Sequence, residues 1–230
     1  GTPLGSTSIF YFLVKISIYF LENRLKKNAI ITDIFGLNGT GKTQLSLQIS
    51  LEPLKQNNDV LFIDTTGEFR PERMFEIIKN RNLDVTFLEN LKIIRVTNTA
   101  EQIKSLEKIN DFEKLSLLII DNVADLFSFE YSKKEQFMLK YSSFMKYMHH
   151  LSTIALKKKI PVIVTNQLLQ KQDTEYEKLD FVMKNFTHQQ IKLEKIKNYY
   201  QGEVDNPFIK KQKFSYSFGP TGIVEQTQSI

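Results

Sequence analysis

Cysteine is absent from the 230 residues of this chain. Disulfide bonds, thiolate metal sites and cysteine nucleophiles are therefore excluded, and an intracellular compartment is the expected location. Long low-complexity tracts and internal repeats are also lacking, which predicts a single domain. With 41% hydrophobic residues, a chain of this length can bury a sizeable core.

No apolar run is long enough to predict a membrane span. The most apolar stretch, residues 9–21, is about a third shorter than the ~20 residues that a spanning helix needs, and Lys15 interrupts it. A small-residue cleavage site is also lacking, so a signal peptide is not expected. Residues 1–6 (GTPLGS) resemble a cloning remnant, and residues 7–28 are expected to lead as a strand or helix into the main domain at 29–230.

Basic residues are only slightly in excess of acidic ones, with 31 Lys and Arg against 26 Asp and Glu. This balance fits ordinary solubility as well as a nucleic-acid surface, so the total decides little. Of the three histidines, His149 and His150 are neighbours that point to different faces of a helix, and His188 stands at a predicted strand start. Structural roles are expected for all three, and no protein-only metal site is predicted.

The most informative stretch of the sequence is residues 30–44, IITDIFGLNGTGKTQ. A β-branched apolar run leads into the pattern G-x-x-x-x-G-K-[ST], the phosphate loop, before a predicted helix. Glycines let backbone N–H groups turn toward phosphate oxygens, and the helix adds the positive end of its dipole. Lys42 is expected to reach the β- and γ-phosphates, and the Thr43 hydroxyl to bind Mg²⁺. The expected nucleotide-binding set is Gly36, Asn38, Gly39, Thr40, Gly41, Lys42, Thr43 and Gln44.

Alternating strand and helix signals predict an α/β domain with a mostly parallel twisted sheet, flanked by helices and closed by C-terminal antiparallel strands. Strands are expected at 29–35, 59–64, 91–96, 115–121 and 161–166, and helices at 42–51, 71–80, from 99 onward and at 133–158. The helix at 42–51 is expected to stop before Pro53. Two alternating segments, 189–195 and 212–218, are expected to pair across a turn near Gly202. The polar segment 167–186 is expected to be an irregular functional loop.

Asp121 ends the apolar strand LLII. Alone, such an aspartate is commonly a turn or helix cap. Beside a phosphate loop, it has the position of the acid that binds Mg²⁺ directly or through water.

Four phrases together resemble one family, the RecA/RadA recombinases and their paralogues. ITDIFGLNGTGKTQL, FIDTTGEFRPERM, LLIIDNVADLF and PVIVTNQL occur in that family's order and at similar spacings, over roughly residues 17–225. The resemblance covers the ATPase core alone. A single core of this size resembles recombinase paralogues such as archaeal RadB. It implies a RecA-like P-loop NTPase fold with ATP and Mg²⁺ as cofactors.

The resemblance also implies roles for residues outside the phosphate loop. Arg73, the last residue of FRPER, matches an arginine that packs on the adenine face, as cation–π stacking allows. Gln167 matches a glutamine that senses the γ-phosphate and begins the second DNA-binding loop. The catalytic set implied in this way is Lys42 and Gln167, with Glu68 as the candidate acid.

One departure from the family concerns that acid. The family places a water-activating glutamate in D-T-E-G, where this chain has Asp64-Thr65-Thr66-Gly67. Thr66 cannot accept a proton from water at neutral pH, and Glu68 would need a shifted backbone to replace the glutamate. Because such help is typically worth about 10²–10⁴-fold in rate, we expect ATP binding with slow or absent hydrolysis.

Contacts with a neighbouring subunit are implied at two places. Asp205 and Pro207 match a D-x-P motif that caps the nucleotide of the adjacent subunit. Phe10 or Phe12 would insert into a neighbour by strand addition, although a strand packed on its own core is at least as good an interpretation.

Lysines are expected on two DNA-binding loops. Lys133 and Lys134 stand in place of the first loop, and Lys171 and Lys178 in the second. They would neutralise phosphates without reading sequence, which predicts weak, salt-sensitive binding of single-stranded DNA at most. Solvated surface lysines explain the same pattern.

Two functions follow as hypotheses. The first is an ATP-binding mediator of homologous recombination and DNA repair that helps a recombinase, or another paralogue, load on single-stranded DNA. The alternative is an active DNA-dependent ATPase that forms filaments and exchanges strands; a pseudo-ATPase scaffold is a third option. The location is expected to be cytoplasmic and nucleoid-associated if the source is archaeal, and nuclear if it is eukaryotic.

Overall fold

The structure is a computed structural model that describes residues 29–171, 174–206 and 209–226. Its strands are β1 (Ile31–Gly36), β2 (Asp59–Asp64), β3 (Leu91–Arg95), β4 (Leu115–Asp121), β5 (Val162–Lys171), β6 (Thr174–Glu177), β7 (Gln189–Ile196), β8 (Tyr199–Asn206), β9 (Ile209–Gly219) and β10 (Gly222–Gln226). Its α-helices are α3 (Lys42–Lys55), α4 (Pro71–Asn80), α5 (Thr99–Ser105), α6 (Asp125–Glu130), α7 (Phe137–Lys158) and α8 (Asp180–Phe186). Short 3₁₀ helices are η1 (Val85–Asn90), η2 (Glu107–Asp111) and η3 (Lys134–Gln136).

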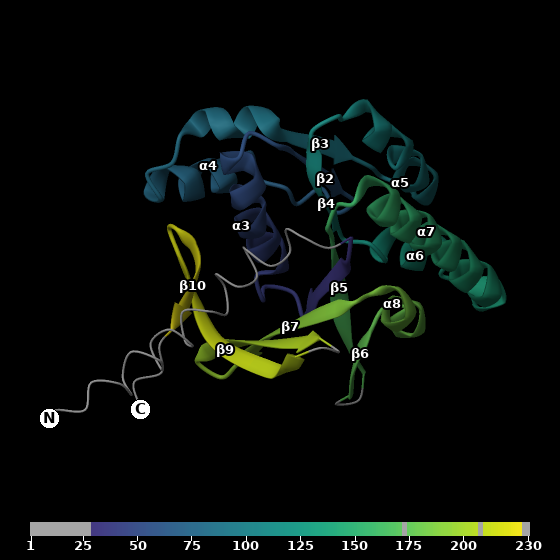
Figure 1. Ribbon diagram of the computed structural model, residues 1–230. Coiled ribbons are helices and arrows are strands. Elements are labelled where there is room, and N and C mark those ends of the chain that lie inside the picture. Colours follow the sequence, from purple (N-terminus) through teal and green to yellow (C-terminus); the bar gives the residue numbers. More distant parts are fainter. Residues whose placement is uncertain (1–28, 172–173, 207–208, 227–230) are drawn as a thin grey trace, which may run out of the picture.

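The strands form one mixed sheet in the order β10-β9-β8-β7-β1-β5-β4-β2-β3, with β6 paired to β5 (Figure 1). β1 lies in the middle, parallel to both β5 and β7, and β2, β3, β4 and β5 continue the parallel part. From β7 to β10 the pairing is antiparallel. Because the carboxyl ends of parallel strands meet at one edge, Gly36 lies opposite Gln167 and Asp64 opposite Asp121. The predicted α/β fold with C-terminal antiparallel strands is confirmed.

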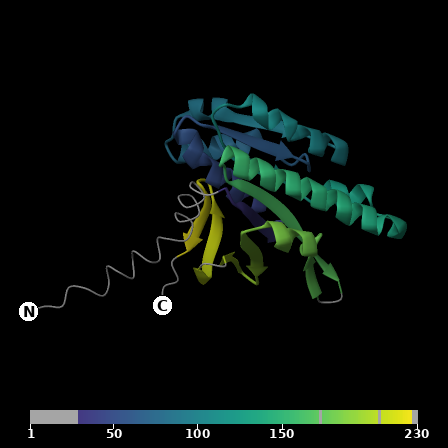
Figure 2. The same ribbon diagram turned by 45° about the vertical axis from the view of Figure 1, so that its right-hand side comes forward.

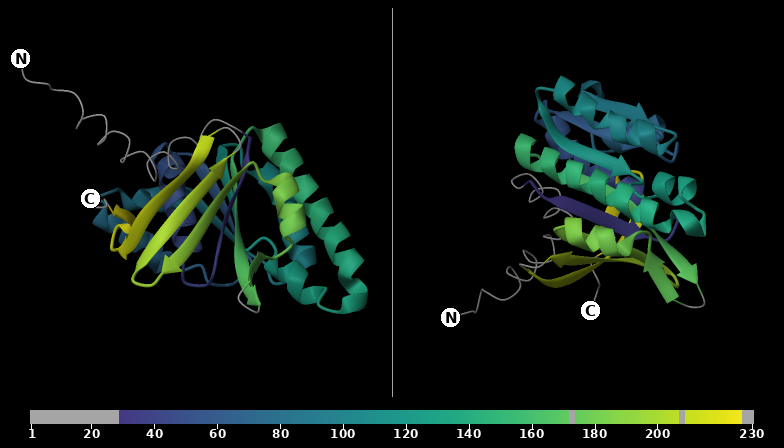
Figure 3. Two further views of the ribbon diagram at one scale, coloured as in Figure 1. Left: turned by 90° about the horizontal axis from the view of Figure 1, so that it is seen from below. Right: turned by 90° about the vertical axis from the view of Figure 1, so that its right-hand side faces the viewer.

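Two hydrophobic cores cover the two faces of the sheet. Successive residues of a strand point to opposite faces, so Val60 and Phe62 join one core while Leu61 and Ile63 join the other. Helices α3 and α4 pack on the first face, and α5, α6, α7 and α8 on the second (Figures 1 and 2). Viewed from below, the C-terminal strands lie side by side, with α7 and α8 beyond them (Figure 3). Burial on both faces explains the continuous apolar runs of β2 and β4.

Most of residues 167–171 and 174–186 lie in strands or a helix, so the prediction of an irregular loop there is wrong. β5 continues through Lys171 and pairs with β6 in an antiparallel hairpin, and α8 follows. Val182 and Met183 of α8 are fully buried in the core beneath α7. Two adjacent apolar residues are too short a signal to predict a helix from sequence, and their burial supplies the stabilisation that the pattern did not reveal.

The turn predicted near Gly202 lies elsewhere. Residues 197–198 join β7 to β8, and Lys197 has a φ of 48°. Gly202 instead lies inside β8, paired with Leu193 and Phe214. A Cβ there would stand 2.1 Å from the Phe214 ring, so the glycine serves close packing rather than a turn.

Two helices differ in length from their predictions. α3 runs past Pro53 to Lys55, because Leu54 in its last turn is fully buried and compensates for the hydrogen bond that proline cannot donate. α7 begins at Phe137 rather than at residue 133, and the Phe137 side chain is 52% exposed, so it does not belong to the buried stripe of this helix. Among the residues that the structure describes, no helix is both long and apolar enough to cross a membrane.

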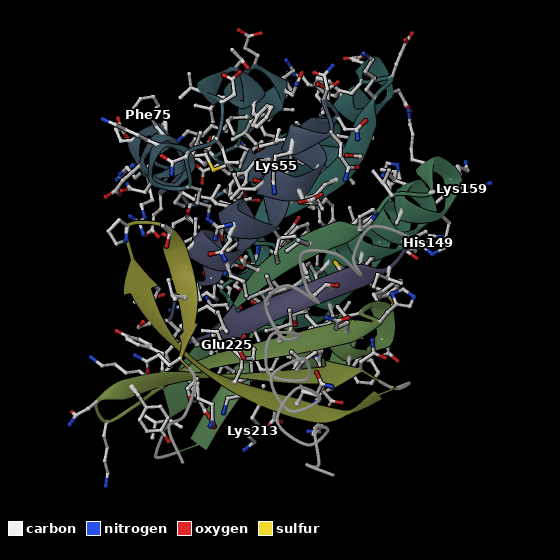
Figure 4. All side chains as sticks on the ribbon, turned by 60° about the vertical axis from the view of Figure 1, so that its left-hand side comes forward. Lys55, Phe75, His149, Lys159, Lys213 and Glu225 are labelled. Atoms are coloured by element: carbon white, nitrogen blue, oxygen red, sulfur yellow. The ribbon has the colours of Figure 1, made fainter. Side chains whose placement is uncertain are left out.

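One of the three histidines, His188, has a structural contact, as expected. His188 accepts a hydrogen bond at Nδ1 from the Ile31 amide, 3.1 Å away, and so joins the start of β1 to β7. His149 and His150 are exposed on α7. Figure 4 shows His149 and Lys159 well separated from Lys213 and Glu225 on the C-terminal strands.

Gly202→Ala tests the close packing of β8 on β9. The new methyl group would meet the buried Phe214 ring, so we expect the free energy of unfolding to fall by about 1–3 kcal/mol in urea unfolding. The control is Gly219→Ala, whose Cβ would find its nearest neighbour at an ordinary 3.6 Å and should change stability by less than ~0.5 kcal/mol. Equal effects of the two substitutions would contradict the packing argument.

Candidate functional site

A cavity of about 690 Å³ opens at the carboxyl edge of the parallel strands. This is the position at which α/β sheets place ligands, beyond the strand ends. The lining residues come from the phosphate loop, the ends of β2, β4 and β5, and β9: Asn38, Gly39, Gly41, Lys42, Thr43, Gln44, Leu47, Thr66, Glu68, Arg70, Arg73, Asp121, Asn122, Asp125, Gln167 and Phe218. Most of the predicted nucleotide-binding residues are therefore brought together in one place.

The loop between β1 and α3 has the form of a phosphate cradle. Gly39 and Gly41 have φ values of 77° and 94°, a region that favours glycine. Thr40 closes the loop from inside by donating its hydroxyl to the Leu37 carbonyl, 2.8 Å away. α3 begins at Lys42 with no side chain capping its first amides. These N–H groups and the helix dipole are therefore available to an anion.

Lys42 lies folded over this loop. Its Nζ donates to the carbonyl oxygens of Gly36 and Leu37, both 3.0 Å away. Burial lowers the pKa of the Lys42 ammonium, and the neighbouring carboxylates of Asp121, Asp125 and Glu68 oppose that shift. A phosphate in the cradle would supply the negative partner that this half-buried cation lacks.

The predicted magnesium ligands lie in contact with each other. Thr43 Oγ1 donates to Asp121 Oδ2 at 2.5 Å, and Thr165 donates its hydroxyl to the other carboxylate oxygen. Burial raises the pKa of Asp121, against the lowering effects of the two hydroxyls and of Lys42. A hydroxyl and a carboxylate side by side at a phosphate loop are the hard oxygen donors that Mg²⁺ prefers, so these residues fit the ion.

The segment after β2 carries Thr66 and Glu68 to the wall of the cavity. Asp64 organises it, because Asp64 Oδ1 accepts from the Thr66 amide and hydroxyl, each at 3.1 Å, and from the Gly67 amide at 2.8 Å. The Thr66 hydroxyl in turn accepts from the Glu68 amide at 3.2 Å. Thr66 thus caps a turn, and Glu68 is the carboxylate of this segment that faces Lys42.

Lys178 lies inside this region rather than on an open DNA-binding loop. Its Nζ pairs with Asp125 Oδ1 at 2.6 Å and approaches Gln167 Oε1 at 3.4 Å. The side chain is only 17% exposed. The sequence predicts that Lys178 contacts DNA phosphates. In the structure its partner is instead the carboxylate of Asp125, beside Gln167, the predicted γ-phosphate sensor.

Arg73 marks the opposite end of the cavity. Its Nε donates to Gln44 Oε1 at 2.7 Å, its Nη2 to the Gly219 carbonyl at 2.8 Å, and its Nη1 to Glu76. All these bonds lie in the guanidinium plane. The contact with a base that the resemblance implies would use the faces of the group instead.

Five residues at the cavity were missed by sequence reasoning: Leu47, Arg70, Asn122, Asp125 and Phe218. Asn122 and Asp125 follow the β4 strand end directly, and that position was a usable signal. No local sequence signal pointed to Phe218, because β9 and the phosphate loop are far apart in the chain and only folding brings them together.

Other predicted residues lie away from the cavity or outside the described part of the chain. Lys133 and Lys134 are exposed where α6 is joined to α7. Asp205 pairs with Lys211 at 3.0 Å on β8. Phe10, Phe12 and Pro207 lie outside the described residues, as does the side chain of Lys171. Their predicted contacts with DNA or a neighbouring subunit stay predictions.

Comparison with known proteins points to one family. The family model described as Rad51 matches residues 20–185. The DNA repair and recombination protein RadA of Metallosphaera sedula is 32% identical over 157 residues, which cover 64% of this chain and 48% of the relative. RadA of Ignicoccus hospitalis is 30% identical over 161 residues, covering 64% and 49%. RadB of Thermoplasma acidophilum is 29% identical over 148 residues, covering 64% and 62%. The chain thus matches about half the length of the RadA relatives and somewhat more of RadB.

Asp121→Asn tests the electrostatic cost of the buried carboxylate. Because burial raises the pKa of Asp121, the folded protein holds this proton more tightly than the unfolded chain, whose aspartates titrate near ~4. That contribution to stability is complete at low pH and is lost as pH rises through the raised pKa. We expect urea unfolding without Mg²⁺ to show the wild type losing stability relative to Asp121→Asn as the pH rises above ~4. A difference between the two proteins that does not change with pH would contradict this.

Proposed function

Because this chain belongs to the Rad51 family of RecA/RadA-type recombinases, we propose that it binds ATP with Mg²⁺ and acts in homologous recombination and DNA repair. Its role would be that of a mediator, helping a recombinase or another paralogue to load on single-stranded DNA. The observation that carries the proposal is the phosphate cradle with Lys42, Thr43 and Asp121 in one cavity.

Each group in the cavity has a role in this proposal. Lys42 exchanges the carbonyls of its own loop for the β- and γ-phosphates. Thr43 and Asp121 hold Mg²⁺, and the metal supplies charge neutralisation between the phosphates. Gln167 would contact the γ-phosphate, and its contact with Lys178, which pairs with Asp125, would couple the γ-phosphate to the β5–β6 hairpin. Nucleotide occupancy would then act as a switch on that hairpin.

Slow or absent hydrolysis is the second part of the proposal. Thr66 cannot serve as a base, and its hydroxyl is engaged with Asp64 and the Glu68 amide. Without a group that orients or deprotonates water, the bound ATP would persist. A long-lived nucleotide suits a switch that holds a partner.

A second candidate, the active DNA-dependent ATPase, has one observation in its favour. Glu68 lines the cavity, and its charge opposes the lowering of the Lys42 pKa that burial causes. In this second candidate, Glu68 takes over the role of the missing water-activating glutamate.

Single-stranded DNA is proposed to bind weakly where α6 meets α7. Lys133 and Lys134 are exposed there, and Phe129 and Phe137 nearby are 80% and 52% exposed. Lysines beside exposed aromatic rings are what sequence-independent binding of single strands uses. The protein would accordingly act at the cell's DNA, in the nucleoid of an archaeal cell or the nucleus of a eukaryotic one.

ATP binding and turnover in Mg²⁺, with and without single-stranded DNA, test the proposal directly. We expect the wild type to bind ATP and to turn it over negligibly, and Lys42→Ala to bind at least about tenfold more weakly. Thr66→Glu should raise turnover by roughly 10²-fold, because it restores a carboxylate at the family's position.

Glu68→Gln is the matched control for the second candidate. Brisk DNA-stimulated turnover in the wild type that Glu68→Gln abolishes would replace the mediator proposal by the active ATPase. Unaltered ATP binding in Lys42→Ala would refute the site itself.

Replacing Lys133 and Lys134 together by Ala tests the DNA surface. Loss of two phosphate contacts should weaken binding of an oligonucleotide several-fold at low salt and lower the dependence of log affinity on log salt by about 1.4. The control is the double replacement of Lys157 and Lys158, which removes the same charge from the far end of α7, about 33 Å away along the helix. If both double variants lose affinity equally, the effect belongs to net charge and not to this surface.

A further inference from the structure

Among the described residues that line the cavity, Phe218 is the one with an aromatic ring, and neither the sequence motifs nor the proposed function gives it a role. It is the last residue but one of β9, next to Gly219, whose carbonyl accepts from Arg73. A Cβ built on Gly41 would stand 2.6 Å from the Phe218 Cε1 atom. The ring therefore lies directly against the phosphate loop, immediately before Lys42.

The exposure of Phe218 sets it apart from its neighbours along the strand. Phe214 and Tyr216, on the same face of β9, are 4% and 0% exposed, whereas Phe218 is 41% exposed. A purely structural ring at the end of a buried stripe would gain free energy by being covered. This ring has its uncovered surface in the cavity that also receives Arg73 and Gln44.

The ring is held in place from both sides. It packs edge to face on Tyr200, with ring centres 4.8 Å apart, and on Tyr216 at 5.9 Å. Tyr216 donates its hydroxyl to the Thr40 carbonyl at 2.6 Å, so these aromatic side chains are fastened to the phosphate loop. On the other side, Gly219 is tied to Arg73. Such support pre-organises the ring before any ligand arrives.

We propose that Phe218 is a stacking platform for the base of the bound nucleotide, acting with Arg73 from the same chain. The inference rests on the proposed nucleotide binding and adds the side chains that recognise the base of the nucleotide. An aromatic ring and a guanidinium both contact the flat face of a base rather than its hydrogen-bonding edge. The ligand class is therefore nucleoside triphosphates, with ATP and GTP bound about equally through this end.

The matched substitutions at this position are Phe218→Leu, which keeps an apolar side chain against Gly41 without the aromatic face, and Phe218→Ala. Phe181→Ala, on α8 and 65% exposed outside the cavity, is the control. Binding of MgATP, MgGTP and magnesium tripolyphosphate is titrated by calorimetry for each protein. Tripolyphosphate keeps the phosphate contacts and lacks a base.

We expect Phe218→Leu and Phe218→Ala to lose about tenfold in affinity for ATP and for GTP, and to stay within about twofold for tripolyphosphate. Phe181→Ala should match the wild type throughout. ATP affinity within twofold of the wild type in Phe218→Leu would overturn the platform. An equal loss for ATP and tripolyphosphate would overturn it too, because Phe218 would then only shape the phosphate loop.

Phe218→Trp gives an independent reading, because the chain contains no tryptophan of its own. Stacking predicts that ATP and GTP quench this single fluorophore and that tripolyphosphate does not, whereas Phe181→Trp responds to none of them. Equal responses of the two reporters would contradict stacking. If the wild type binds neither ATP nor tripolyphosphate, the proposed function fails, a result distinct from a wild type that binds ATP without using Phe218.

Discussion

The buried carboxylate of Asp121 is the group on which the rest of the site depends. It ends β4, and its two oxygens accept the hydroxyls of Thr43, at the start of α3, and Thr165, in β5. One side chain thus fixes the relative positions of the phosphate loop and two central strands. Burial makes its negative charge unfavourable, which the raised pKa expresses. A divalent cation would relieve that penalty, so the arrangement that costs stability in the ligand-free protein favours metal and nucleotide binding.

The other end of the cavity depends on the C-terminal hairpin. The Gln48 side chain of α3 exchanges two hydrogen bonds with the Ile223 backbone of β10, and Arg73 of α4 donates to Gly219 at the end of β9. These bonds hold the last strands against the helix that follows the phosphate loop (Figure 1). The proposed phosphate and base subsites are therefore built from opposite ends of the described chain, and the complete cavity exists only when the antiparallel strands have docked.

The structure brings the motif residues of the proposed phosphate site together, as expected, because their positions depend on local sequence. Gly36 to Thr43 are consecutive, and Asp121 stands at the end of an apolar run that could only be a buried strand. Prediction failed where contacts between distant segments decide. Two buried side chains, Val182 and Met183, turn a polar stretch into α8, and the ring of Phe214 requires Gly202 inside a strand. The sequence predicts Lys178 on a loop, in contact with DNA or solvent, whereas in the structure it follows the β5–β6 hairpin and pairs with Asp125.

By itself, then, the sequence determined the family, the parallel α/β core, the phosphate-loop motif with Thr43 and Asp121 as candidate metal ligands, and Thr66 at the position where the family has a glutamate. These rest on the order of neighbouring residues, which backbone geometry and hydrophobic periodicity translate directly into structure. Only the tertiary structure decided that Glu68 faces Lys42, that Lys178 pairs with Asp125, and that Phe218 lies against Gly41. Each of these joins residues far apart in the chain or on separate elements, and such contacts are set by sheet order and packing, which no local pattern encodes.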